Sequence, residues 1–488
     1  MTPRRLRSAP HRRVRTAGME HGRSRPCAAR EHGRFRWWAL IAGAVAAMTL
    51  GAAQAAPLQV FTPDAIHFWR LGNGLRVVLK EDHSAPAVAI NVVVRAGSRA
   101  ETANNNGIAH FLEHMVFRSA RAGGHDSLSA PIEAVGGLIN GGTLRDFAHY
   151  SAVVPAPHFR LALDGLAKSL IHPIFEPAAV DAERTVLARE AQQLADQPSA
   201  VAWDTAFQLA YGAHPYALPI SGAHAAIAAI DADALAAFHR RLYVPGNASV
   251  VIVGDIGPDQ AKAAVAAAFG QWKAAAAPPV VPPPPPLAGP VERIVSRPAP
   301  CATVTVAFRA LGISQPRQVC AADLLLALIG EGYTSRLKRA LVDARLADEF
   351  SVSFLTQAAP GLFGVQATCS PDRIQAVRRA IEGEAARLGA DLVSDDELAK
   401  AKQRLVHEYA FANETFEDQA ATLGFYEAIA SYQFAVGYLD RVRSITAAEL
   451  QAVAHACLDP AHEVWVAIRP ESRAQSAPGA AHGTGAIP

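Results

Sequence analysis

Apolar and polar positions along the chain follow two periods, and their order predicts alternating strands and helices. In the first half, apolar segments at residues 67–71 and 75–81 flank a Gly-Asn-Gly turn, which predicts a β-hairpin. Mostly apolar runs at residues 87–97 and 249–255 predict buried strands. Helical spacing of apolar residues predicts three helices, over residues 107–117, 159–171 and 177–195.

The second half repeats this order of elements. Strands are predicted at residues 301–310, 363–370 and 463–470, and a helix at residues 317–330. Two long stretches rich in Ala, Glu and Arg precede the last strand and predict helices. The repetition indicates a duplicated α+β unit, because the order of the elements recurs although the residues do not.

A proline-rich segment at residues 277–290, with five consecutive prolines, separates the two halves. We interpret it as an extended connector, because such a run forms neither a helix nor a central strand; a proline-rich recognition motif is the alternative. A chain of 488 residues also exceeds one ordinary core. We therefore expect an α+β protein with two homologous domains, residues 56–276 and 291–472, each with helices packed on an antiparallel-rich sheet. Residues 473–488 predict a flexible tail.

Residues 1–55 have the features of a Sec-type signal peptide. An arginine-rich start is followed by an apolar run at residues 37–50, shorter than the roughly 20 residues of a membrane-spanning helix, and then by a small-x-small cleavage pattern. We expect cleavage before Ala56, export to the periplasm, and no stable membrane span in the mature chain. A retained N-terminal anchor is the alternative, and Met19 is a second candidate start.

Charge and cysteine content narrow the choice of partners and sites. The signal carries 11 arginines and two acidic residues, so the formal charge of +2 becomes about −7 once it is removed. A negatively charged mature chain is a poor candidate for binding nucleic acid. The mature chain has no C-x-x-C spacing, which argues against a thiolate zinc cluster. Buried free thiols or a disulfide are both open for its four cysteines, Cys301, Cys320, Cys369 and Cys457.

The strongest functional signal is the H-x-x-E-H segment from His110 to His114. Helix positions four apart lie on one face, so the two imidazoles can converge on one metal ion with Glu113 beside it. Catalytic zinc sites combine three protein ligands with a water molecule. A carboxylate next to that water can accept its proton, and the order of residues is that of the inverted zinc motif.

Two structural interpretations of the same segment compete with a metal site: histidines that cap a core, or a surface helix with charge-paired ends. The apolar neighbours Ile108, Phe111, Leu112 and Val116 argue against a solvated helix face. Burying unpaired His and Glu side chains among them would be costly, and a metal ion would compensate that cost.

A third metal ligand is expected from the helix predicted at residues 177–195. This helix contains Glu183 and Glu190, seven residues apart and therefore on one face. From this spacing either carboxylate could reach the ion, and both could instead simply solvate the helix.

Taken together, these segments resemble the pitrilysin or insulinase family of zinc peptidases, and within it the processing-peptidase branch. The resemblance rests on H-x-x-E-H and on the later E-R-x-V-x-x-x-E helix that contains Glu190. Five further segments match as they stand: LGNGLRVVL, RAGSRAE, NGGTLRDFAHY, HPYALPISG and VPGNASVVIVGD. The resemblance covers roughly residues 65–470, densely in the first half and thinly in the second.

The resemblance implies roles for individual residues of the first half. It implies Zn²⁺ held by His110, His114 and Glu190, with Glu113 as the general base, Glu183 as a supporting acid of the catalytic site, and Asn140 and Thr143 as substrate-positioning residues. The last two would belong to an edge strand beside which a peptide adds as a further β-strand. The two domains would close like a clam shell around a chamber.

The second half departs from the family pattern. Self-sufficient members carry an arginine and a tyrosine, seven residues apart, that hold the substrate and stabilise the oxyanion. Here these slots fall at Leu341 and Asp348, and the second half contains no R-x6-Y; Arg336 and Arg345 are weak stand-ins. Either activity is weak or a partner supplies the pair, and the family includes complexes in which a homologous chain does so. We therefore expect a homologous partner subunit in a heterodimer, or a homodimer.

The sequence thus predicts an exported zinc metalloendopeptidase that cleaves peptides or small unfolded polypeptides. The alternative is a non-catalytic binding or assembly subunit with a vestigial metal site. The complete set of His, His and Glu ligands with a general base favours the enzyme. Nothing in the sequence predicts which peptides are cleaved.

Overall fold

The computed structural model describes residues 58–118, 128–275, 278, 281–330, 332 and 335–471. The predicted signal peptide at residues 1–55 and the predicted tail at residues 473–488 lie outside the described residues. Across the described ranges, no helix has both the length and the apolar character that crossing a bilayer requires.

The first half contains a mixed sheet with the strand order β1-β2-β6-β3-β5-β4. Its strands are β1 (Ile66–Arg70), β2 (Arg76–Glu81), β3 (Ala87–Val94), β4 (Leu138–Thr143), β5 (Ala148–Pro155) and β6 (Ala248–Gly254). β1 and β2 pair antiparallel across the Gly-Asn-Gly turn, which confirms the predicted hairpin. β3 and β6 lie side by side in the sheet and are almost wholly buried, as their apolar runs predict. β4 is an edge strand and pairs with β5.

The second half contains a mixed sheet with the order β7-β11-β8-β10-β9. Its strands are β7 (Val291–Arg297), β8 (Ala302–Arg309), β9 (Glu349–Phe354), β10 (Leu362–Cys369) and β11 (Glu463–Pro470). This sheet repeats the first sheet without β1: one parallel pair, β7 with β11, corresponds to β2 with β6, and the remaining pairs are antiparallel in both. The predicted duplication and the α+β class are therefore confirmed.

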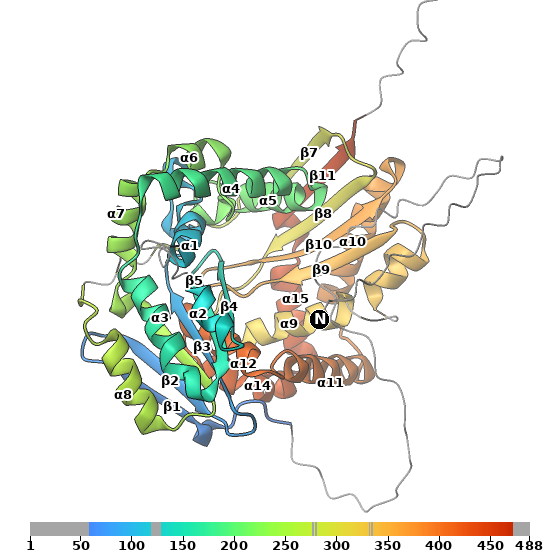
Figure 1. Ribbon diagram of the computed structural model, residues 1–488. Helices are drawn as coiled ribbons and strands as arrows, with labels where there is room; N and C mark the ends of the chain where they lie inside the picture. Colours follow the sequence, from blue (N-terminus) through green and yellow to red (C-terminus); the bar gives the residue numbers. More distant parts are fainter. Residues whose placement is uncertain are drawn as a thin grey trace, which may run out of the picture. The chain divides into compact units, whose positions relative to one another are not determined.

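Helices pack on both sheets (Figure 1). Their bounds are α1 (Ile108–Arg118), α2 (Ser129–Ala134), α3 (Phe159–Ile171), α4 (Pro177–Ala195), α5 (Pro198–Tyr211), α6 (His224–Ala229), α7 (Ala232–Leu242), α8 (Pro258–Phe269), α9 (Pro316–Gly330), α10 (Ile374–Ala390), α11 (Asp395–Phe411), α12 (Phe416–Ile429), α13 (Gln433–Val436), α14 (Tyr438–Ser444) and α15 (Ala447–Cys457). α1 and α3 share a buried apolar core with the first sheet, and α9, α10 and α15 share another with the second sheet.

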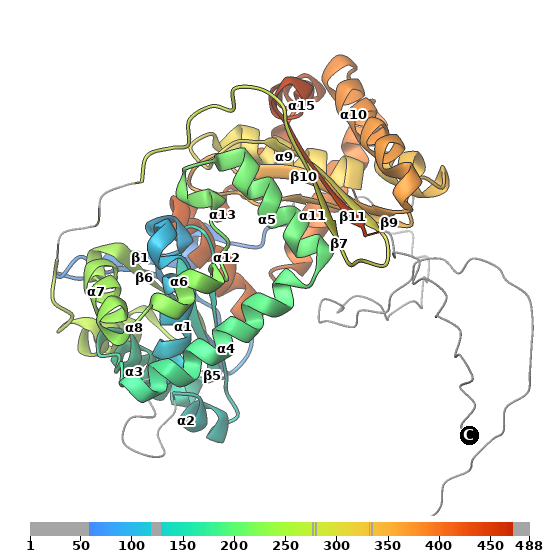
Figure 2. The same cartoon turned by 90° about the horizontal axis from the view of Figure 1, so that it is seen from above.

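The opposite face of each sheet is covered by a helix from the other half of the chain. α5, from the first half, packs on β8 and β11, and α12, from the second half, packs on β3 and β6 (Figures 1 and 2). Glycines allow both close approaches. A Cβ atom on Gly364 of β10 would lie 2.4 Å from the Trp203 ring of α5, and one on Gly424 of α12 would lie 2.7 Å from Asn91 of β3. The two halves are therefore joined by exchanged helices as well as by the connector.

Two smaller predictions can be compared with the structure. Residues 281–288 of the connector contain neither helix nor strand, as a proline-rich linker should. Among the described residues, Cys301, Cys320, Cys369 and Cys457 form no disulfide; Cys320, Cys369 and Cys457 are buried, and Cys301 is partly exposed. The interpretation as buried free thiols is therefore confirmed for Cys320, Cys369 and Cys457, and it is wrong for Cys301, which is not buried.

Candidate metal centre

The histidine motif lies on α1, whose apolar face is buried in the core of the first half. Ile108, Phe111, Leu112 and Val116 are at most 1% exposed, as the sequence pattern predicts. The polar face of the helix carries His110, which lies beside α4. The motif is therefore on a rigid, packed element rather than on a loop.

A buried carboxylate caps the N-terminal end of α1. Glu101 accepts hydrogen bonds from the backbone N–H groups of Gly107 and Ala109, at 2.8 and 2.9 Å. These groups have no partner within the helix, so the cap satisfies them. Burial raises the pKa of Glu101 to about 7, although the hydrogen bonds from Gly107 and Ala109 act to lower it. Gly107 has φ = +96°, and a Cβ atom on it would lie 2.8 Å from Gly222. The RAGSRAE segment thus supplies the carboxylate that caps α1, and the HPYALPISG segment supplies Gly222, which packs against its start.

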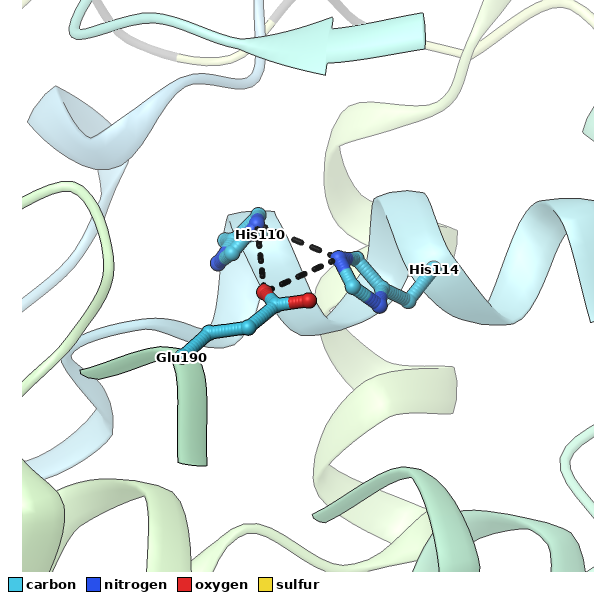
Figure 3. Close-up of side chains that lie close together, drawn as sticks. All are labelled: His110, His114 and Glu190. Atoms are coloured by element: carbon cyan, nitrogen blue, oxygen red, sulfur yellow. Dashed lines mark hydrogen bonds and ion pairs between the residues drawn. The ribbon is translucent and has the colours of Figure 1, made fainter. Parts of the chain in front are cut away.

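The Nε2 atoms of the two motif histidines are directed toward the same position in space, called the common point below. Their Nε2 atoms lie 3.2 Å apart, and the ring planes are nearly perpendicular (Figure 3). Two nitrogen ligands of a tetrahedral zinc ion would lie about 3.3 Å apart at the usual Zn–N distances. The separation of His110 and His114 therefore matches that of two ligands of one ion.

Glu190 of α4 supplies a third donor atom at the common point (Figure 3). Its Oε2 atom is 3.9 Å from Nε2 of His110 and 3.7 Å from Nε2 of His114. The three donor atoms lie within 4.8 Å of one another, and each side chain is partly exposed. Two imidazoles and a carboxylate are the ligand set of a well-known class of catalytic zinc sites. The residues present therefore fit Zn²⁺.

Burial and charge affect the two imidazoles differently. Burial, together with the neighbouring His114, lowers the pKa of His110 to about 4, so His110 is neutral at physiological pH. Burial also acts to lower the pKa of His114, but the hydrogen bond to Glu183 and the charges of Glu113 and Glu190 outweigh it and raise that pKa. The surrounding carboxylates therefore favour a positive charge beside His114, which a bound cation would supply.

Glu183 contacts His114 but is not part of the group of three donor atoms. Its Oε1 atom accepts a hydrogen bond from Nδ1–H of His114 at 2.8 Å, and its Oε2 atom pairs with Arg118. Burial acts to raise the pKa of Glu183, but the bond to His114 and the charge of Arg118 lower it overall. Because Nδ1 of His114 carries the proton, its Nε2 atom presents a lone pair to the metal position. Of the two carboxylates that the sequence left open, the geometry favours Glu190 as the ligand and Glu183 as the residue that orients His114.

Glu113 is buried beside the two histidines. It accepts a hydrogen bond from Oγ1 of Thr143 at 2.8 Å. Burial raises its pKa, although this hydrogen bond acts in the opposite direction. A carboxylate with a raised pKa holds a proton more readily, which suits a general base.

Asn140 and Thr143 both lie on the edge strand β4, as the resemblance implies. Thr143 faces α1 and contacts Glu113, whereas Asn140 is exposed. Gly141 and Gly142 stand between them and have no side chains to obstruct the edge; a Cβ atom on Gly141 would collide with the Phe117 ring at 2.5 Å. The structure thus brings Thr143 into the site and leaves Asn140 at the open edge of the sheet.

The two slots in the second half offer no replacement for the absent arginine and tyrosine. Leu341 is fully buried in the core of the second half, and Asp348 is exposed at the start of β9. Arg336 forms a two-pronged ion pair with Glu397, at 3.2 and 3.0 Å. Arg336 is therefore already paired within the second half.

Sequence reasoning missed two residues of the site. Glu101, which caps α1, lies within the RAGSRAE segment, and the resemblance of that segment to the family does not indicate a helix cap. Arg118, which pairs with Glu183, is four residues after His114 and therefore on the same helix face. That spacing was the available signal: a basic residue on this face can bind one of the two candidate carboxylates and so distinguish them.

Comparison with known proteins identifies the family. A model described as "Insulinase (Peptidase family M16)" matches residues 76–224, and a model described as "Peptidase M16 inactive domain" matches residues 229–405. The chain therefore belongs to the insulinase family of peptidases, and its two halves match that family's paired domains.

Curated relatives carry peptidase names. An uncharacterized zinc protease of Bacillus subtilis is 32% identical over 184 residues, which are 38% of this chain and 45% of that protein. A probable mitochondrial-processing peptidase subunit beta of Arabidopsis thaliana is 28% identical over 346 residues, 69% of this chain and 65% of that protein. The match thus spans less than two thirds of the length of either relative.

The fold is also similar to that of solved structures. A protease from Helicobacter pylori superimposes with a TM-score of 0.79 at 23% sequence identity, covering 83% of this chain and 99% of that one. At this identity the comparison establishes the two-domain fold and nothing about activity.

Proposed function

We propose that the chain is the metal-bearing subunit of a zinc-dependent endopeptidase that cleaves peptides or small unfolded polypeptides. The observation that carries this proposal is the convergence of His110, His114 and Glu190, with the carboxylate of Glu113 beside them. The zinc protease name of the Bacillus relative supports the same metal and reaction class.

Each side chain of the site has a role in peptide-bond hydrolysis. His110, His114 and Glu190 would hold Zn²⁺, which when bound polarises the scissile carbonyl and makes water more acidic. Glu113 accepts a proton from the attacking water and later donates it to the leaving amine. Thr143 fixes the orientation of Glu113 through their hydrogen bond. Glu183 keeps His114 in the tautomer that leaves Nε2 free.

The edge strand β4 provides the binding surface for the substrate. Its outer edge offers backbone N–H and C=O groups, to which an extended peptide can bind as an additional strand. Thr143 belongs to this strand and also contacts Glu113, so the strand and the general base are connected directly. A peptide bound there is held mainly through its main chain, which suits unfolded substrates of varied sequence.

Metal analysis combined with a cleavage assay tests the proposal. We expect the purified chain to contain about one Zn²⁺ per molecule, and we expect a chelator to abolish cleavage of a quenched fluorescent peptide. Adding Zn²⁺ should restore cleavage. Circular dichroism before and after chelation serves as the control that the fold persists. Cleavage that is indifferent to the chelator would refute the proposal.

The missing arginine and tyrosine lead us to propose a homologous partner that supplies them. The name of the Arabidopsis relative identifies it as one subunit of a processing peptidase, which supports such an arrangement. Leu341 cannot substitute for a donor, because it is apolar and fully buried. The same observation favours the second candidate function, a binding subunit without activity of its own.

Assays of the chain alone and with a homologous chain that contains the R-x6-Y pair separate these cases. We expect slow cleavage by the chain alone and an increase in kcat of about 100- to 1,000-fold in the mixture, which is the effect of one oxyanion donor. Full activity of the chain alone would disprove the need for a partner. Peptide binding without cleavage in either sample would favour the binding subunit.

A further inference from the structure

A buried carboxylate in the turn between β4 and β5 is not used by any step of the proposed reaction. Asp146 is 6% exposed, and both of its carboxylate oxygens accept hydrogen bonds. Its Oδ1 atom accepts from Nη1 of Arg99 and from the hydroxyl group of Tyr216, each at 2.6 Å. Its Oδ2 atom accepts from the backbone N–H of Ala358, at 3.0 Å. This one side chain therefore connects its own turn to three separate segments of the chain.

The bond from Ala358 comes from the second half of the chain. Ala358 belongs to the loop at residues 355–361, between β9 and β10. Carbonyl groups of this loop accept hydrogen bonds from the backbone N–H groups of Ala310 and Ile313, each at 2.9 Å. The loop is thus anchored within the second half. Asp146 therefore binds a fixed part of that half.

The turn that contains Asp146 is also joined to the general base and to the helix of the metal centre. Three residues before Asp146, Thr143 ends β4 and donates a hydrogen bond to Glu113. The backbone N–H of Arg99 donates to a carbonyl of the same turn at 2.8 Å, and Glu101, two residues later, caps α1. A displacement of the turn would therefore move the end of β4 together with the group that orients Glu113.

The energetics of this contact favour a role in positioning over a role in stability. A buried ion pair adds little to the free energy of folding, because the cost of desolvation offsets much of the attraction. The side chains of Asp146 and Arg99 are 5% and 20% exposed, so this cost applies to them. What the contact supplies is a fixed geometry, since donors from separate segments hold the carboxylate in one orientation.

We infer that Asp146 is a positioning residue through which the second half fixes the edge of β4 for peptide binding. The loop at residues 355–361 holds Asp146, and Asp146 holds the turn at the end of the strand to which an extended peptide would bind. The half that matches the inactive-domain model would thereby have a defined part in substrate binding. This inference rests on the proposed peptidase function, because it requires a peptide along β4.

Two buried tyrosines offer a matched pair of variants. Tyr216 and Tyr211 are 0% and 2% exposed, and the hydroxyl group of each forms a hydrogen bond with the loop at residues 355–361. The hydroxyl group of Tyr216 also donates to Asp146, whereas that of Tyr211 donates to the carbonyl of Pro360 at 2.7 Å. Replacement by phenylalanine removes a bond between the halves in both cases. Only Tyr216→Phe also removes a bond to Asp146.

Binding measurements on these variants test the inference independently of cleavage. The zinc-loaded full chain with Glu113→Gln keeps a peptide intact, and fluorescence anisotropy of a fluorescein-labelled casein peptide reports its Kd. In this background we expect Asp146→Asn to raise Kd at least about 10-fold, because the amide nitrogen faces a donor in either orientation and the turn must move. Tyr216→Phe should raise Kd about fivefold, and Tyr211→Phe less than about twofold. Zinc content should be the same in all variants.

A residue with a purely structural role would behave differently. Its replacement would lower the temperature of unfolding and the fraction of chains that bind, but would leave Kd of the folded fraction unchanged. That result for Asp146→Asn, equal Kd values for the two tyrosine variants, or no peptide binding before any of these substitutions would overturn the inference. If Asp146→Asn does not fold, the tyrosine pair decides.

The same measurements separate this inference from the proposed function. Weaker binding by Asp146→Asn and Tyr216→Phe, but not by Tyr211→Phe, supports the positioning role whether or not the peptide is cleaved. If that pattern occurs while the chain with Glu113 intact shows no chelator-sensitive cleavage, the inference stands and the peptidase function is refuted.

Discussion

Replacing Glu113 by glutamine is expected to lower kcat by about 100- to 10,000-fold, the usual contribution of a general base, while zinc content stays unchanged. Glutamine has the same shape, and its amide oxygen can still accept the hydrogen bond from Thr143. The substitution therefore removes the ability to accept a proton and little else. Metal analysis and steady-state kinetics on one preparation measure both quantities.

The result distinguishes a base from a ligand. If zinc is lost together with activity, Glu113 binds the metal and the assignment of the site must change. Glu133→Gln is a matched control, because Glu133 is an exposed glutamate on α2, outside the site, and the same chemical change there should leave kcat and zinc content unaltered. Unchanged kcat in Glu113→Gln would eliminate Glu113 as the base.

Local sequence patterns predict those elements whose contacts are between residues close together in the chain. The hairpin of β1 and β2 follows from a two-strand pattern around Gly-Asn-Gly, and α1 from apolar spacing. The placement of His110 beside His114 also follows, because it depends only on helix geometry. These features need no information about the rest of the chain.

Contacts between distant segments were not predictable in this way. Nothing in the residues of α5 shows that this helix packs on the second sheet. The packing depends on Gly364, more than 150 positions after Trp203, which leaves room for the indole ring. The covering of the first sheet by α12 depends in the same way on Gly424. A mainly apolar cavity of about 350 Å³, lined by Asn91 of β3, His149 of β5 and Phe425 of α12, is a product of this exchange, which explains why no motif indicated it.

The ambiguity between Glu183 and Glu190 has the same origin. Seven residues on a helix give both carboxylates the same direction, and only the crossing of α1 and α4 decides which one meets the histidine Nε2 atoms. In the structure, the carboxylate of Glu183 pairs with Arg118 and accepts a hydrogen bond from Nδ1–H of His114. The carboxylate of Glu190 faces the Nε2 atoms of both imidazoles. The sequence therefore identifies Glu183 and Glu190 as candidate ligands, and the geometry of the two helices distinguishes between them.

This separation gives a matched pair of substitutions on one helix. Glu190→Gln is expected to reduce bound zinc to a small fraction of one per chain, because it replaces a charged ligand by a neutral amide. Glu183→Gln is expected to retain most of the zinc, with an affinity reduced by about 10- to 100-fold, because it disturbs only the partner that orients a ligand. Zinc retained per chain after dialysis against graded chelator concentrations measures both effects.

Activity should follow the metal differently in the two variants. Excess Zn²⁺ should restore much of the cleavage by Glu183→Gln, since His110, His114 and Glu190 are all still present. The same addition should not rescue Glu190→Gln, which lacks one of the three donors. Zinc retained in Glu190→Gln but lost in Glu183→Gln would transfer the role of ligand to Glu183, and would require α4 to lie differently against α1 in the metal-bound protein.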